Sequence, residues 1–88
     1  MSKEFEKNLS GNGKRIAIVV AEFNEMVTDA LLRGAVDRLE ALGVSSENIF
    51  VAKVPGAFEI PGVCRRLADT GSYDAIIALG AVIRGETS

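Results

Sequence analysis

The sequence of 88 residues contains no histidine and no tryptophan, and it has one cysteine and two prolines. Histidine is the side chain whose unperturbed pKa lies closest to neutrality. Acid–base chemistry would therefore need an Asp, Glu, Lys or Cys with a shifted pKa, a group of the substrate, or a residue of another chain. Because Cys64 is the only cysteine, a disulfide within the chain is excluded, which fits a reducing, cytoplasmic setting.

Strong charge bias and long hydrophobic runs are also absent. The formal net charge is −2 and the isoelectric point is about 5.0, so there is no electrostatic reason to expect nucleic acid. No apolar run approaches the length of a membrane span, and the charged N-terminus lacks the apolar core of a signal peptide. The sequence has no P-loop, no dinucleotide fingerprint and no paired-cysteine metal spacing. We therefore expect neither a nucleic acid nor a membrane as a partner.

Three short apolar runs, 16–21, 49–54 and 75–83, alternate with two segments of helical periodicity. This β-α-β-α-β order predicts an α/β fold, a parallel sheet joined by right-handed crossovers with helices on both faces. The third run has nine residues without a charge, which suits the centre of a sheet. The sequence after this run is too short to cover the other side of the strand. We therefore expect an incomplete unit, which is either the first half of a larger domain or a chain that relies on another chain.

The first helical segment is predicted to begin at Asn24 or Thr28, either of which could cap it, and to stop at Gly43. Its apolar residues cover roughly two-thirds of the helix circumference, which is more than one sheet face hides. We therefore expect a second packing partner for this helix. The apolar positions are Val27, Ala30, Leu31, Leu32, Ala35, Val36, Leu39 and Leu42.

The polar segment 1–14 precedes the first strand and contains a turn signal at 10–13. One interpretation is an N-terminal arm that needs a partner surface to be ordered. The other is a frayed terminus. Residues 15–88 would then form the domain proper.

Polar and aromatic side chains follow each predicted strand, at the sheet edge where parallel α/β proteins bind ligands. Phe23 could stack on a flat heterocycle or plug the end of the core. Glu59 could bind ligand hydroxyls or simply favour the positive end of a helix. The segment 84–88 could bind an anion through Arg84, Thr87 and backbone amides, or could be an ordinary turn.

Four stretches, taken together and in order, resemble the lumazine synthase family, whose members make 6,7-dimethyl-8-ribityllumazine in riboflavin biosynthesis. The most specific are VPGAFEIP at 54–61 and the VIRG run at 82–85, which lies within the stretch 73–87; the others are 16–24 and 31–35. The resemblance covers the whole chain but little more than the first half of a family member. It implies a flavodoxin-like sheet and a transferase that condenses 5-amino-6-(D-ribitylamino)uracil with 3,4-dihydroxy-2-butanone 4-phosphate. It implies no metal or redox cofactor.

The resemblance also implies roles for individual residues. Phe23 would stack on the pyrimidine, and Glu59 would hydrogen-bond the hydroxyls of the ribityl chain. Arg84 would lie near the phosphate. The other implied binding positions are Ala57 and Phe58 beside the ribityl chain, Ala81, Val82 and Ile83 at the pyrimidine edge, and Glu86 and Thr87 at the phosphate.

No catalytic residue is assigned within the chain, because the proton-transferring histidine of the family would follow Ser88. We therefore expect these 88 residues to be inactive alone. The resemblance further implies a homo-oligomer, either a pentamer or a capsid of sixty subunits, with the arm 1–14 on a neighbour's sheet. Riboflavin synthase is a second candidate partner. The alternatives are a non-catalytic assembly module and a flavin- or lumazine-binding module.

Overall fold

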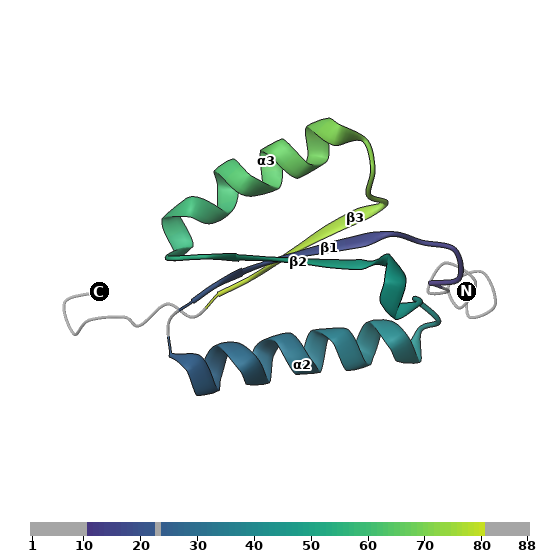
Figure 1. Cartoon of the computed structure of the whole chain (residues 1–88), viewed down its shortest axis with the longest axis horizontal. Helices are drawn as coiled ribbons and strands as arrows, with labels where there is room; N and C mark the ends of the chain where they lie inside the picture. The colour runs from purple at the N-terminus through teal and green to yellow at the C-terminus, as the bar shows by residue number, and fades with distance from the viewer. Residues whose placement is uncertain (1–10, 23, 81–88) are drawn as a thin grey trace, which may run out of the picture.

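The computed structural model describes residues 11–22 and 24–80, and it confirms the predicted alternation of strands and helices (Figure 1). The strands are β1 (Ile16–Ala21), β2 (Ile49–Val54) and β3 (Ala75–Leu79). The α-helices are α2 (Glu25–Ala41) and α3 (Ile60–Thr70). Two short 3-10 helices, η1 (Ser46–Asn48) and η2 (Ala57–Glu59), precede β2 and α3.

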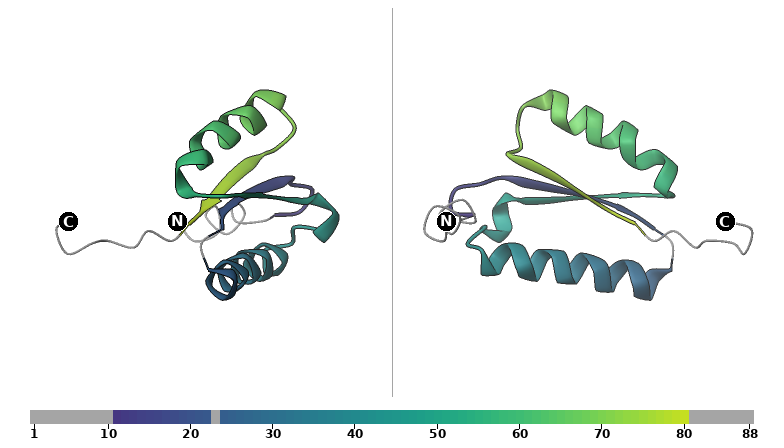
Figure 2. Two further views of the ribbon diagram at one scale, coloured as in Figure 1. Left: turned by 60° about the vertical axis from the view of Figure 1, so that its left-hand side comes forward. Right: turned by 180° about the vertical axis from the view of Figure 1, so that it is seen from behind.

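The three strands form one parallel sheet in the order β2-β1-β3. Ala21 at the end of β1 pairs with Val54 at the end of β2, and Val20 pairs with Leu79 at the end of β3. Helix α2 covers one face of the sheet and α3 covers the other, as the views from several sides agree (Figures 1 and 2). All three strands therefore end at the same edge of the sheet.

Strand β1 forms the centre of the core, and all of its residues are buried. Ile16 and Ile18 point to the α2 face, where they pack with Leu39 and Val44. Alternate residues of β1 point to the α3 face and pack with Val54 and the inner side of α3. Burial on both faces explains why β1 reads as a continuous apolar run rather than an alternating one.

Strand β3 was predicted to suit the centre of a sheet, and that position stays a prediction. The described strand has five residues, and it pairs with β1 on one side only, so within the described residues it lies at an edge rather than in the centre. The right-handed crossovers explain this order, because they place β2 and β3 on opposite sides of β1. Ala75 and Ala78 are exposed, so the strand is as apolar as predicted but only partly covered by the described chain.

Helix α2 begins after Asn24, one of the two residues predicted to cap it. The Asn24 side chain, in an extended backbone conformation, accepts hydrogen bonds from the backbone N–H groups of Met26 at 2.9 Å and Val27 at 3.4 Å. Thr28, the other candidate, is buried within the helix. The helix ends at Ala41 with Leu42 as its C-cap, and Gly43 follows with a φ of +100°, in the left-handed region that glycine favours.

Replacing Asn24 by alanine is expected to lower the free energy of unfolding by about 0.5–2 kcal/mol, because the first turn of α2 loses its side-chain acceptor. Urea unfolding followed by circular dichroism measures this change. Asn24→Asp keeps an acceptor at the same position, so it should stay within a few tenths of a kcal/mol of the parent. Equal losses in the two variants would contradict a capping role.

The apolar residues of α2 extend beyond the face that packs against the sheet, as predicted. Leu32, Ala35 and Val36 pack against the core. The side chains of Val27 and Leu31, in contrast, are 40% and 38% exposed. Ala30 and Gly34 lie on the same exposed side of α2, which we call the exposed stripe. A Cβ added at Gly34 would meet no atom within 4 Å. Among the described residues this stripe therefore stays partly exposed.

Candidate functional site

The loops that follow the three strands begin side by side. The backbone N–H of Glu22 donates to the carbonyl of Val54 at 2.7 Å, which joins the end of β1 to the end of β2. Gly80 directly follows β3 and lies close to the end of β1 and the start of α3. A Cβ built on Gly80 would lie 3.6 Å from Cβ of Ala21 and 3.5 Å from Cδ1 of Ile60. This edge of the sheet is therefore where side chains from three loops can meet.

The segment that follows β2 forms a compact bend. Its backbone turns through η2, where the N–H of Glu59 donates to the carbonyl of Gly56 at 3.1 Å, and continues directly into α3. Pro61 lies in the first turn of α3, where a residue without an N–H costs no intrahelical bond. The sequence of this bend thus specifies a short loop that is followed directly by the N-terminus of α3.

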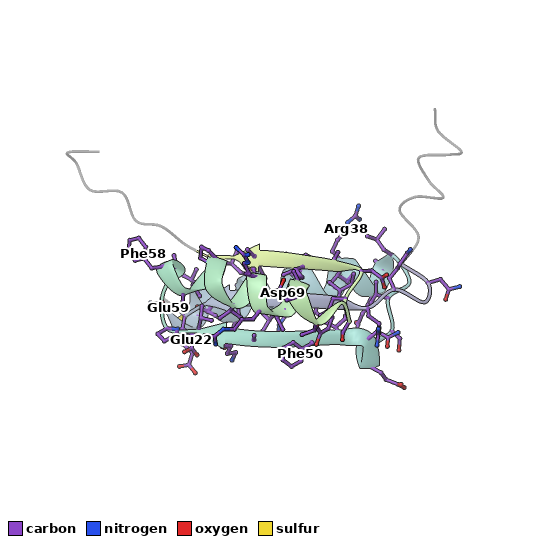
Figure 3. All side chains as sticks on the ribbon, turned by 90° about the horizontal axis from the view of Figure 1, so that it is seen from above. Glu22, Arg38, Phe50, Phe58, Glu59 and Asp69 are labelled. Carbon is purple, nitrogen blue, oxygen red and sulfur yellow. The ribbon has the colours of Figure 1, made fainter. Side chains whose placement is uncertain are left out.

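Ala57, Phe58 and Glu59, all predicted to bind ligand, lie on this bend and are exposed. The Phe58 side chain is 98% exposed, so it contributes nothing to the core. Figure 3 shows Phe58, Glu59 and Glu22 grouped at one end of the molecule, whereas Arg38 lies toward the other. The Glu59 carboxylate lies at the positive end of α3, which stabilises a negative charge there.

A surface hollow of about 240 Å³ adjoins this bend and is lined by Phe58, Glu59, Gly62, Val63 and Arg66. It combines an aromatic ring, a carboxylate that accepts hydrogen bonds, and a guanidinium that donates them. Such a lining suits a ligand with both an apolar surface and several hydroxyl groups. The hollow is open to solvent, so the described residues provide one wall of a site rather than an enclosed pocket.

The remaining predicted site residues lie outside the described part of the chain. They are Phe23, Ala81, Val82, Ile83, Arg84, Glu86 and Thr87. Their described neighbours are at the expected edge: Glu22 and Asn24 flank position 23, and Gly80 immediately precedes Ala81. The roles expected of these residues stay predictions.

A second hollow at the same edge was not predicted. It measures about 180 Å³ and lies between the end of β2 and the start of α2. Glu22 comes from the loop after β1, and Lys53 is the only charged residue of β2. A lysine at the penultimate position of an otherwise apolar strand is the signal that could have revealed it. The lining residues are Glu22, Glu25, Thr28, Asp29 and Lys53.

Other kinds of site find no support among residues 11–22 and 24–80. No group of three or more potential metal ligands occurs there. Cys64 is half-buried on the inner side of α3, where it packs against the core, as a structural cysteine does. Across the same residues, no helix has the length and hydrophobicity that crossing a membrane would require.

An open parallel sheet in the order β2-β1-β3, with a helix on each face, is a flavodoxin-like α/β architecture whose ligands bind beyond the carboxyl ends of the strands. The family model described as 6,7-dimethyl-8-ribityllumazine synthase matches residues 13–88. The chain belongs to that family.

Two curated relatives carry the name 6,7-dimethyl-8-ribityllumazine synthase. The protein from Desulfatibacillum aliphaticivorans is 55% identical over 87 residues, which cover 99% of this chain and 56% of the relative. The protein from Thermococcus onnurineus is 54% identical over 83 residues, which cover 94% of this chain and 53% of the relative. The chain therefore spans little more than half the length of the relatives it matches, and the resemblance seen in its motifs is confirmed.

Proposed function

We propose that this chain carries ligand-binding loops of an enzyme that condenses 5-amino-6-(D-ribitylamino)uracil with 3,4-dihydroxy-2-butanone 4-phosphate to give 6,7-dimethyl-8-ribityllumazine. The observation that carries the proposal is the exposed bend 55–59, held at the carboxyl edge of the sheet in a chain 55% identical to a protein of that name. In this reaction the substrate amine forms an imine with the ketone and releases water, phosphate leaves, and the ring closes with loss of a second water.

Within this proposal Glu59 accepts hydrogen bonds from the ribityl hydroxyls. A carboxylate accepts without donating, and bonds between hydroxyls and a charged acceptor are the stronger kind. Ala57 and Phe58 border the ribityl chain, and Phe23 stacks on the pyrimidine ring. These groups bind and orient the first substrate, so that its amine is presented to the ketone.

The loop after β3 is assigned to both substrates. Ala81, Val82 and Ile83 would offer backbone groups to the pyrimidine edge, and the amides of Glu86 and Thr87, with Arg84 nearby, would bind the phosphate. Proton transfer is assigned to a group outside these 88 residues, because they contain no histidine. No metal or redox cofactor enters the proposed reaction.

The direct test measures lumazine formation from the two substrates. Purified chain is assayed alone and after mixing with the C-terminal part of a relative. We expect no turnover by the chain alone and turnover in the mixture, because the proton-transferring group would then be supplied. Full activity of the chain alone would contradict the assignment of proton transfer, and a mixture that folds but stays inactive would contradict the proposed reaction.

The exposed stripe favours a second candidate function, a module for assembly or ligand binding without catalysis. Val27 and Leu31 remain partly exposed on α2, and burying such residues on another subunit would be favourable. We propose that the intact protein is a homo-oligomer, a pentamer or a capsid, with the arm 1–14 on a neighbouring sheet. Riboflavin synthase is a proposed further partner, and the cytoplasm the proposed location.

Light scattering combined with the activity assay separates the two candidates. A discrete oligomer that binds ligand without turnover, even when mixed with the C-terminal part of a relative, would favour the non-catalytic module. An oligomer that gains turnover in the mixture would favour the enzyme. Flavin titration of the parent and of Phe23→Ala addresses the flavin-binding alternative, since unchanged affinity would remove Phe23 as the stacking surface.

A further inference from the structure

The backbone of Gly56 bonds to Glu59, and the absence of a side chain leaves room beside the Glu59 carboxylate. The Gly56 carbonyl accepts the hydrogen bond from the Glu59 N–H at 3.1 Å. Apart from its two chain neighbours, a Cβ added to Gly56 would meet one described atom within 4 Å, Oε1 of Glu59 at 3.2 Å. The space where a side chain of residue 56 would lie is thus bordered by the Glu59 carboxylate.

The backbone itself does not require glycine at this position. Gly56 has φ −154° and ψ 169°, which is extended backbone that any residue adopts. A left-handed conformation, which is the backbone reason that most often requires glycine, is therefore absent here. What a larger residue would change is the room available to the Glu59 side chain.

Little else fixes the Glu59 carboxylate in the described structure. Glu59 is the N-cap residue of α3, but its side chain makes no capping hydrogen bond. Its backbone is held by Gly56, and its side chain is exposed. The direction of the carboxylate is therefore set by the neighbour that it touches and by the positive end of α3.

We infer that Gly56 is a positioning residue for Glu59: by having no side chain, it lets the carboxylate lie back over the bend, where its oxygens face outward for a polyol. This inference rests on the proposed function for the identity of the ligand. A methyl group at residue 56 would displace the carboxylate by a few tenths of an ångström. Hydrogen bonds to several hydroxyls at once tolerate such a shift poorly, because they depend on distance and angle.

A double-mutant cycle tests whether Gly56 acts through Glu59. Affinity for 5-amino-6-(D-ribitylamino)uracil is measured for the parent, Gly56→Ala, Glu59→Gln and the double variant. Gly56→Ala is expected to weaken binding about threefold to tenfold in the parent, about the loss of one ordinary hydrogen bond. It should change binding less than about twofold when Glu59 is already replaced, because contacting residues are not additive. Equal losses in both backgrounds, or none in the parent, would overturn the inference.

A readout without ligand separates this inference from the proposed function. Three-bond NMR couplings give the χ1 populations of Glu59 in the parent and in Gly56→Ala. We expect the populations to shift, while the free energy of unfolding stays within about 0.5 kcal/mol, as for most changes at exposed positions. Unchanged populations would overturn the positioning role even if binding is lost. If the parent binds no ribitylaminouracil, the proposed function fails, and the NMR result still decides the role of Gly56.

Discussion

Replacing Glu59 by glutamine is expected to weaken binding of ribitylaminouracil about 10- to 100-fold. The substitution keeps the size of the side chain but removes the charge, and a hydrogen bond to a charged group contributes about 1.5–3 kcal/mol. The fall should appear in both the dissociation constant and the rate of lumazine formation at low substrate concentration. Isothermal titration and steady-state kinetics of the chain mixed with the C-terminal part of a relative measure these quantities.

Glu47 provides the matched control for this prediction. It is also an exposed glutamate in a short 3-10 helix beside β2, but it lies at the amino end of that strand rather than the carboxyl end. Glu47→Gln changes the net charge by the same amount and should leave affinity and rate within about twofold, as expected for a substitution far from the ligand. A similar loss in both variants would attribute the effect to net charge and would contradict a binding role for Glu59.

Replacing Ile18 by alanine is expected to destabilise the fold by about 2–5 kcal/mol. Ile18 has no exposed surface, and it lies in the central strand where α2 packs against the sheet. The variant loses buried apolar surface and leaves a cavity that β1, paired on both sides, cannot easily close. The free energy of unfolding from urea titration measures the loss, which for so small a domain is a large part of the total.

Leu31→Ala is the control, because it removes the same number of carbon atoms from a partly exposed position. Leu31 lies on the exposed stripe of α2, and alanine has the higher helix propensity. In the isolated chain we expect a change below about 1 kcal/mol. Equal losses at the two positions would mean that β1 is not the energetic centre of the fold.

The fold was predictable because its determinants are local. Each strand is a short apolar run rich in β-branched residues, and each helix is bounded by residues with a specific structural role, such as Asn24 at the start of α2 and Gly43 at its end. The parallel order then follows from the alternation of elements and the handedness of crossovers. The neighbours of β3 were less predictable, because composition indicates how apolar the surroundings of a strand are and not which neighbours supply them.

The site was predictable only in part. The segment 55–61 carries its own geometry, since a proline at each end and a glycine within it define a bend that leads into a helix. The hollow beside Lys53 was missed because it depends on α2 and β2 lying side by side, which no single segment encodes. The contact between Gly56 and the Glu59 carboxylate likewise required coordinates, because a glycine without left-handed backbone looks unremarkable in a sequence.

The position of β1 has a consequence for how firmly the site is anchored. Among the described strands, β1 alone has hydrogen-bonded neighbours on both sides, so opening its backbone requires the cooperative loss of the whole sheet. The Glu22 N–H bond to Val54 ties the bend after β2 to that slow-opening strand. The bend after β2 can therefore stay exposed to solvent while the residue from which it starts moves no more than the interior does. This limits the conformational entropy that the bend would lose when a ligand binds.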